Sequence, residues 1–154
     1  MHPEEHALGS FDLINDRLWY CTHYGEIGAK DLRQGRSKAS VYEASEKKLN
    51  TVHVNPIDPN YLVTAGLDRI VRIFDIRNLK KEAEPLKSFE HGKSVNSAYW
   101  DPVFGKDIVS TSFDDTLGLW KDSLGDSSRH IIIKHNNNTG TFFIHSNKSR
   151  SMGA

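Results

Sequence analysis

Short runs of apolar and β-branched residues, separated by turn-forming residues, recur along most of the chain. The runs are followed by Gly, Pro, Asn, Asp or Ser, which favour turns, and this combination indicates short β-strands. No segment keeps a long apolar period of 3.6 residues, the mark of an amphipathic helix. The pattern therefore predicts an all-β protein with few helices.

The predicted strands form three sets of four. The first set is Leu8–Asp12, Arg17–Thr22, Glu26–Asp31 and Ser40–Ala44. The second set is Asn50–Asn55, Tyr61–Ala65, Ile70–Asp75 and Leu86–Phe89. The third set is Val95–Trp100, Ile108–Ser112, Leu117–Trp120 and His130–Lys134.

The third strand of each set ends in a similar way, which reveals an internal repeat. The endings are Asp31-Leu32-Arg33, Asp75-Ile76-Arg77 and Trp120-Lys121-Asp122. The spacing is 44 residues from Asp31 to Asp75 and 46 from Asp75 to Lys121. A period of about 40–45 residues is typical of a β-propeller blade, which has four antiparallel strands. The alternative is a single β-sandwich with chance self-similarity.

The repeat predicts a propeller fragment of about three four-stranded blades. We expect a first blade over residues 1–48, a second over 49–92 and a third over 93–140. Residues 141–154 are polar and divergent, and we expect them to form a disordered tail.

Two segments resemble the signature of WD-repeat proteins, GLDRIVRIFD (66–75) and SFDDTLGLW (112–120). In that family a turn Asp, a His, a Ser or Thr and a Trp form a hydrogen-bond network that holds the blade. The resemblance assigns these structural roles to Asp68, His91, Asp114 and Trp120. Phe74 replaces the Trp in the second blade and cannot donate the indole hydrogen bond, so we expect an incomplete network there.

Longer runs narrow the resemblance: KKLNTVHVNPIDPNYLVTAGLDRIVRIFDIR, HGKSVNSAYWDP, STSFDDTLGLW and KHNNNTG. They are similar to damaged-DNA-binding WD-repeat proteins, the family of the small subunit of the ultraviolet-damaged-DNA-binding complex. The branch typified by WD-repeat-containing protein 76 and fungal DNA damage-binding proteins is closer still. The resemblance covers about Gly9 to Gly140. Family members have seven blades, so we expect this chain to be a fragment or truncated product, with blade faces left exposed.

The resemblance implies an adaptor-binding site at the strand-end boxes. Asp75 and Arg77 match the aromatic-Asp-x-Arg box of substrate receptors for cullin-4 ubiquitin ligases, and Arg33 repeats the box one blade earlier. In that family the Arg contacts the ligase adaptor, the large damaged-DNA-binding subunit. The alternative is an Arg that pairs locally with its own blade.

The resemblance also implies a DNA-facing rim. The basic positions of this rim in the family match Lys48, Arg69 and Lys93. Cations one blade apart can contact successive phosphates of a DNA strand without recognising the base sequence. The turn of Asn136, Asn137 and Asn138 matches the region of a lesion-probing hairpin, but it lacks an aromatic wedge. The alternatives are solvated surface cations and a plain loop.

Composition and motif content limit which other classes of protein the chain can belong to. The 20 basic and 20 acidic residues balance, which does not favour nucleic-acid binding but leaves room for a local basic patch. Cys21 is the single cysteine, so we expect no disulfide, and no apolar run is long enough to span a membrane. We find no catalytic or metal-binding constellation and expect no cofactor and no small-molecule substrate.

The sequence therefore predicts a nuclear, non-enzymatic DNA-binding WD-repeat protein of the DNA damage response, possessing a cullin-4 adaptor site. The alternative is a generic WD-repeat scaffold for protein interactions, without nucleic-acid binding.

Overall fold

The computed structural model describes residues 7–36, 38–126 and 129–135 and confirms the predicted fold class. The described chain forms three antiparallel sheets of four strands, and each sheet contains four strands consecutive in sequence. Each sheet is one blade. The only helix in these ranges is the short 3₁₀ helix η1 (Ile76–Asn78), as the absence of a helical period predicted.

The strands follow the predicted runs closely. The first blade contains β1 (Leu8–Ile14), β2 (Arg17–Thr22), β3 (Glu26–Asp31) and β4 (Ser40–Glu43). The second contains β5 (Leu49–Val54), β6 (Tyr61–Gly66), β7 (Ile70–Asp75) and β8 (Lys87–Glu90). The third contains β9 (Val95–Trp100), β10 (Ile108–Ser112), β11 (Thr116–Lys121) and β12 (Arg129–Lys134).

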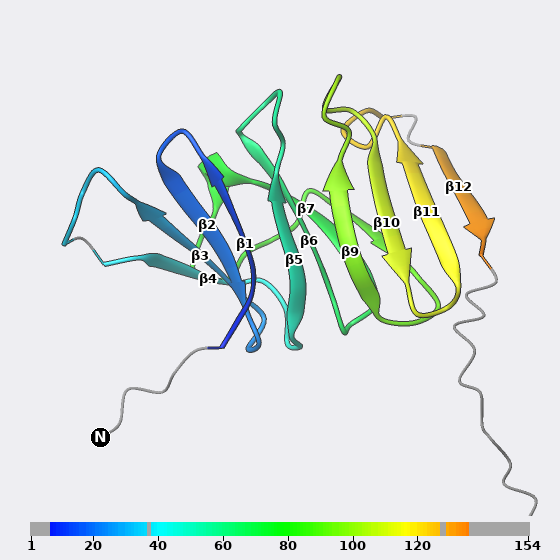
Figure 1. The fold of residues 1–154 in the computed structure, drawn as a ribbon, viewed down its shortest axis with the longest axis horizontal. Helices are drawn as coiled ribbons and strands as arrows, with labels where there is room; N and C mark the ends of the chain where they lie inside the picture. Colours follow the sequence, from blue (N-terminus) through cyan, green and yellow to red (C-terminus); the bar gives the residue numbers. More distant parts are fainter. Residues whose placement is uncertain (1–6, 37, 127–128, 136–154) are drawn as a thin grey trace, which may run out of the picture.

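The three blades stand side by side in an open arc (Figure 1). The first strand of each blade lies next to the first strand of the following blade, so that β1, β5 and β9 are neighbours. We call the packing of the first blade on the second the first junction, and the packing of the second on the third the second junction.

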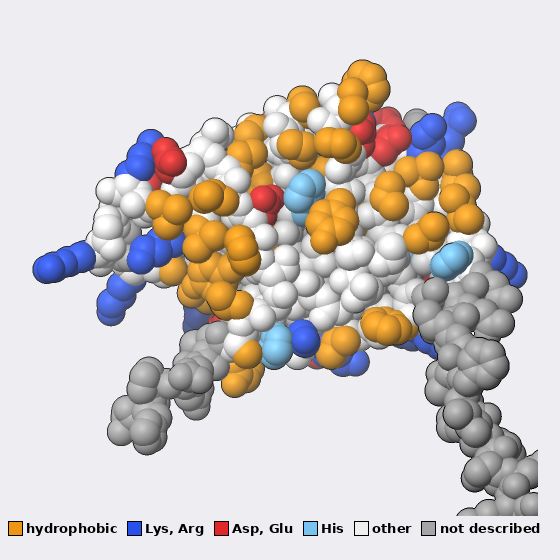
Figure 2. All heavy atoms as spheres, in the orientation of Figure 1, with side chains coloured by type: hydrophobic (Ala, Val, Ile, Leu, Met, Phe, Trp, Pro, Cys, Tyr) orange, Lys and Arg blue, Asp and Glu red, His pale blue; other side chains and the backbone are white. Residues whose placement is uncertain are grey.

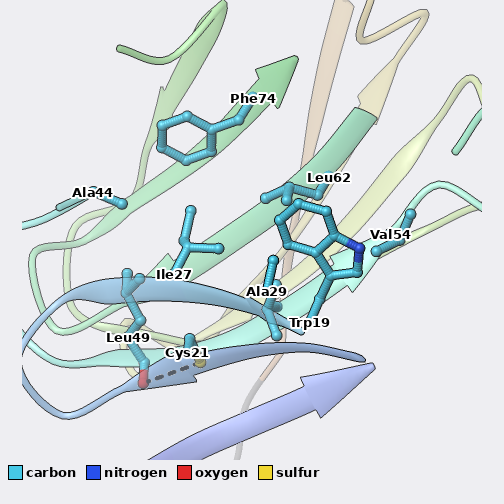
Figure 3. Packing of buried hydrophobic residues seen from close by; sticks show 10 residues of the cluster. Trp19, Cys21, Ile27, Ala29, Ala44, Leu49, Val54, Leu62 and Phe74 are labelled. Atoms are coloured by element: carbon cyan, nitrogen blue, oxygen red, sulfur yellow. Dashed lines mark hydrogen bonds between the residues drawn. The ribbon is translucent and has the colours of Figure 1, made fainter. Parts of the chain in front are cut away.

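Each junction has its own hydrophobic core. In the first junction Trp19 and Ile27 of the first blade pack with Leu62 and Phe74 of the second, all nearly inaccessible to solvent (Figure 3). In the same core Cys21 is buried and its thiol donates to the Leu49 carbonyl over 3.6 Å, and burial raises its pKa to about 11. The second core joins residues of the second and third blades, namely Val63, Ala65, Val71, Ile73, Val95, Ala98, Trp100, Ile108 and Trp120.

The strands of the middle blade are the most deeply buried of the three blades. Successive side chains of a strand point to opposite faces of its sheet, and both faces of the second blade are covered. Strand β6 is therefore buried at every position after Tyr61. The outer faces of the first and third blades are covered by no other described residues, and exposed apolar side chains remain there.

Tight approaches fix the turns and linkers between strands. Gly25 has a φ of +82°, and a Cβ at this position would lie 1.9 Å from the Ser45 carbonyl oxygen. Glycine is the residue that accepts both constraints. The β2–β3 turn can therefore lie directly against the linker that leads into the second blade.

Candidate nucleic-acid and partner interfaces

The strand order separates the connections into two rims. The lower rim in Figure 1 holds the turns at residues 23–25, 67–69 and 113–115 and the inter-blade linkers at 44–48 and 91–94. The upper rim holds the loops between the first and second strands and between the third and fourth strands of each blade.

The three cations predicted to face DNA all lie on the lower rim. Lys48 belongs to the linker before β5, Lys93 to the linker before β9, and Arg69 to the β6–β7 turn. Lys93 is exposed and Lys48 is half-buried. Arg69 is also exposed, adopts a φ of 73°, and has a guanidinium nitrogen 3.5 Å from a Glu90 carboxylate oxygen. This acidic neighbour partly offsets the positive charge of the rim.

Backbone pairing shifts the correspondence between the two lysines by one residue. The Lys48 carbonyl accepts from Leu67, and the Ser94 carbonyl accepts from the matching Phe113. Lys47, which is exposed, therefore takes the place that Lys93 has one blade later. Sequence spacing aligned Lys48 with Lys93 because the strand was predicted to begin at Asn50, one residue after the observed start of β5 at Leu49.

The three asparagines predicted to form a DNA-facing turn, Asn136, Asn137 and Asn138, lie outside the described residues, as does the predicted tail. The described chain reaches His135 on the lower rim, whose backbone N–H donates to the Asp115 carbonyl over 2.7 Å. The tip of this connection therefore remains a prediction.

The two Asp-x-Arg boxes lie on the opposite, upper rim. Asp75 is almost buried and accepts from Nε and Nη2 of Arg77 over 2.9 and 2.7 Å. Asp31 accepts in the same bidentate way from Arg33, over 3.0 and 2.8 Å. Both arginines thus make the local pair that was the alternative to adaptor contact. Because the side chains of Arg33 and Arg77 are 70% and 57% exposed, they also remain accessible.

The local pairs fix the charge of both boxes. The hydrogen bond from Arg77 holds the pKa of Asp75 below its ordinary value, and that from Arg33 holds the pKa of Asp31 at about 2. A bidentate carboxylate also restrains the flat guanidinium fork, which reduces the entropy lost when a partner binds it. The Arg77 guanidinium lies 5.8 Å from the centre of the Tyr61 ring.

A shallow groove of about 230 Å³ lies between the two boxes. Arg17 stands over the Trp19 ring at 4.7 Å and lines the groove together with Arg33. Its apolar lining includes Ile14, Pro59 and Ile76. The sequence prediction missed Arg17 because this residue belongs to no Asp-x-Arg box. Arg17 reaches this rim because it pairs with Asp31 across β2 and β3.

The WD-repeat network is present at the second junction. Ser110 accepts from the Trp120 indole over 2.7 Å, and its hydroxyl lies 2.8 Å from Nε2 of His91. The other ring nitrogen of His91 lies 3.6 Å from the Asp114 carboxylate, which accepts from the Gly92 backbone over 2.7 Å. The structure thus brings together His91, Asp114 and Trp120, the residues to which the resemblance assigned this network. Ser110, which the sequence prediction did not single out, is the centre of this network.

Burial and hydrogen bonding set the protonation of the network. Burial lowers the pKa of His91, although the nearby Asp114 carboxylate opposes this effect. Burial also acts to raise the pKa of Asp114, but hydrogen bonds from Thr116 and Gly92 outweigh it and bring the pKa to about 2. The folded blade therefore favours a neutral imidazole next to a charged carboxylate.

The first junction lacks this network, as the Phe74 substitution predicted. Thr64 takes the place of Ser110, and its buried hydroxyl has no hydrogen-bond partner. Ala44 takes the place of His91. Asp68 instead accepts from the Ser45 hydroxyl over 2.7 Å and pairs with the Arg72 guanidinium. The predicted structural Asp68 thus holds its blade through an ion pair.

Several classes of site are absent from the described residues. In this part of the chain no three or more His, Cys, Asp or Glu side chains are grouped so that they could hold a metal ion. None of the described helices is long and apolar enough to cross a membrane.

No family model matches the chain, but it is similar to known WD-repeat proteins. It is 38% identical over 144 residues to WD repeat-containing protein 76 of Mus musculus, covering 89% of this chain and 23% of that protein. It is 34% identical over 139 residues to DNA damage-binding protein cmr1 of Emericella nidulans, covering 80% and 26%. The chain therefore spans about a quarter of the length of these curated relatives.

Solved structures show the same fold at low sequence identity. The β-propeller domain of Cps50 (Swd1) from Myceliophteria thermophila superposes with a TM-score of 0.70 at 14% identity, covering 85% of this chain and 40% of that one. A chain of the mitotic checkpoint complex gives a TM-score of 0.72 at 16% identity, covering 88% and 40%.

The blade architecture and the network around Ser110 define a WD-repeat β-propeller segment. Within this class the resemblance seen in the sequence is confirmed. Most of the chain is similar to part of WD repeat-containing protein 76 and of the fungal cmr1 proteins.

Proposed function

We propose that this chain is a DNA-binding WD-repeat segment that acts in the nucleus in the response to DNA damage, by binding and recruitment and not by catalysis. The observation that carries the proposal is its similarity to proteins named for DNA damage binding, at 34% identity over 80% of the chain for cmr1 of Emericella nidulans. The placement of Lys48, Arg69 and Lys93 on one rim supports it.

The lower rim suits the phosphate backbone better than the base edges. Its cations lie on a turn and two linkers, one blade apart, and a row of this kind contacts successive phosphates without sequence preference. Glu90 close to Arg69 limits the local charge, so we expect moderate affinity that weakens steeply with salt.

The test is DNA binding by the full chain, measured by fluorescence anisotropy with a short duplex at several salt concentrations. The Lys48→Ala, Lys93→Ala double variant should bind more weakly and reduce the salt slope by about 2, since each lost phosphate contact contributes about 1. Arg69→Ala should reduce the slope by about 1.

The matched control removes two exposed lysines from the upper rim, in the Lys80→Ala, Lys106→Ala double variant. This control should leave affinity and slope unchanged. Equal losses in both double variants would show charge-driven binding without a site. Absence of DNA binding by the unmodified chain at low salt would favour the protein-interaction scaffold instead.

The upper rim supports a second candidate function, binding of the cullin-4 ligase adaptor through Arg77 and Arg33. The supporting observation is that Asp75 and Asp31 hold both arginines in the same bidentate geometry on one rim. Arg77→Ala should abolish co-purification with the adaptor, and Arg33→Ala should weaken it. Arg77→Lys should also fail, because an ammonium cannot reproduce the planar fork. Undiminished co-purification of Arg77→Ala would remove this function.

A further inference from the structure

The outer face of the third blade, here the trailing face, is apolar and covered by no other described residue. It carries Tyr99, Val109, Leu117, Leu119, Ile131 and Ile133, which alternate along the strands with the residues of the second junction. Val109 is 46% exposed, whereas Val63 at the same position of the second blade is fully buried in the second junction. The trailing face thus repeats a surface that the second blade already uses for docking.

The outer face of the first blade, here the leading face, repeats the complementary surface. It carries Leu8, Phe11, Leu13, Leu18, Tyr20 and Val41. Leu13 is 56% exposed, whereas Val54 and Trp100, at the same position of the next two blades, are buried. Figure 2 shows hydrophobic side chains gathered at both ends of the arc.

One side chain of the trailing edge matches a hollow on the leading face. His135 follows β12 as His91 follows β8, and both backbone N–H groups donate to the preceding β-turn, at Asp115 and Arg69. At the second junction His91 enters the next blade and reaches Ser110. On the leading face, Tyr20 occupies the Ser110 position and borders an open hollow of about 460 Å³, which Glu26 also lines.

We propose that a second copy of this chain docks head to tail, with the leading face of one copy on the trailing face of the other. The contact reproduces the second junction: Val109 takes the place of Val63, Leu13 that of Trp100, and His135 enters the hollow beside Tyr20. This inference is independent of the proposed function, because it uses neither rim's cations nor the Asp-x-Arg boxes.

At Lys30 the new contact has a charged residue where both internal junctions have an aromatic ring, Phe74 or Trp120. Lys30 occupies the place of Trp120, on which Phe89 of the preceding blade stacks at 4.7 Å. In the docked pair the aliphatic stem of Lys30 lies near Ile133, the counterpart of Phe89, while its ammonium reaches water at the edge. Lys30→Phe should therefore tighten the association several-fold.

The experiment is the mass of the full chain in solution, measured by light scattering over a concentration series. We expect at least twice the 17.4 kDa of one chain at high concentration. Leu13→Glu blocks the leading face and Val109→Glu the trailing face, so each variant alone should be monomeric. Their mixture should form a dimer, because each variant keeps the face that the other has lost.

The control is Phe104→Glu, which places the same charge on an apolar side chain that is 70% exposed on the upper rim, away from both faces. It should associate like the unmodified chain, and His135→Ala should associate more weakly. Leu8→Glu and Ile133→Glu are a second blocking pair if the first does not fold. Two outcomes would overturn the proposal. A monomer at every concentration would mean that the two faces bind other blades and not a second copy. Self-association of Val109→Glu alone would mean that two leading faces pair with each other.

Discussion

The two blade junctions share one backbone register and differ in the side chains that it brings together. Ser110 pairs with Gly118 across β10 and β11, and Thr64 pairs with Arg72 across β6 and β7. Four equivalent positions hold different residues in the first and second junctions. They are Ala44 and His91, Thr64 and Ser110, Arg72 and Gly118, and Phe74 and Trp120.

The differences are linked by steric contact. A Cβ on Gly118 would lie 2.7 Å from the Ser110 hydroxyl and 2.8 Å from Nε1 of Trp120, so the bond between these two groups needs a glycine beneath it. In the first junction Arg72 occupies that position and pairs with Asp68. An indole network and an arginine ion pair are therefore alternative solutions at the same place, and each excludes the other.

The comparison also distinguishes the apolar core, which both junctions share, from the polar groups, which differ between them. Both have a core of large buried apolar side chains, and the dominant stabilisation comes from this burial. The polar groups differ, and neither junction satisfies all of them. Thr64 leaves a hydroxyl unpaired in the first junction, and Trp100 leaves an indole N–H unpaired in the second.

The largest expected loss of stability tests the apolar cores, which the two junctions share. Trp120→Ala and Phe74→Ala each remove a buried aromatic ring from one junction, and each should lower the free energy of unfolding by about 3–5 kcal/mol. Urea denaturation with an unchanged m-value measures both. A loss below about 1 kcal/mol for Phe74→Ala alone would mean that the indole network, and not the core, stabilises the arc.

The next effect tests the network itself. Ser110→Ala leaves the buried Trp120 indole without its acceptor and His91 without its closest partner, so we expect a loss of about 2–3 kcal/mol. Thermal and urea unfolding give the value. A neutral result would show that water replaces the hydroxyl and that the network contributes little.

Acid should weaken the second junction in two steps of the same sign. Because the folded state lowers the pKa of His91, the unfolded chain takes up a proton more readily, and stability falls as the pH drops below about 6.5. Asp114, with a pKa of about 2 in place of 3.8, contributes about 2 kcal/mol that is lost as the pH falls from about 4 to 2. His91→Gln should reduce the first step to the part that comes from His53, whose pKa burial also lowers, and should keep the second. Unfolding free energies between pH 7 and 2 would contradict this account if His91→Gln kept the full slope near pH 6.

The smallest effect has the opposite sign. Thr64→Val keeps the shape of the side chain and removes the unpaired hydroxyl of the first junction, so it should stabilise the protein by about 1 kcal/mol. The equivalent position in the second junction, Ser110, should respond with a loss. If Thr64→Val instead lowers the free energy of unfolding by a similar amount, the hydroxyl has a partner such as an ordered water. The two junctions would then differ less in how their buried polar groups are satisfied.

The sequence alone predicted the strands, their grouping in fours and the family. Period-two alternation and turn residues are local properties, so β2, β3, β7, β9 and β10 have the predicted bounds and most other strands begin or end within a residue or two of the prediction. The repeated endings placed Asp75 and Lys121 in register because equivalent blades keep equivalent spacing. The missing indole at Phe74 likewise predicted an incomplete network, since Phe has no donor.

Tertiary structure decided which side chains meet. Ser110 becomes the centre of the network only because β10 brings it below His91, which comes from the linker of another blade. Arg17 reaches the groove beside Arg33 through strand pairing, and Lys47 replaces Lys48 as the counterpart of Lys93 because backbone pairing starts β5 at Leu49. These contacts join residues distant in sequence, and they depend on register and blade packing, which local preferences do not encode.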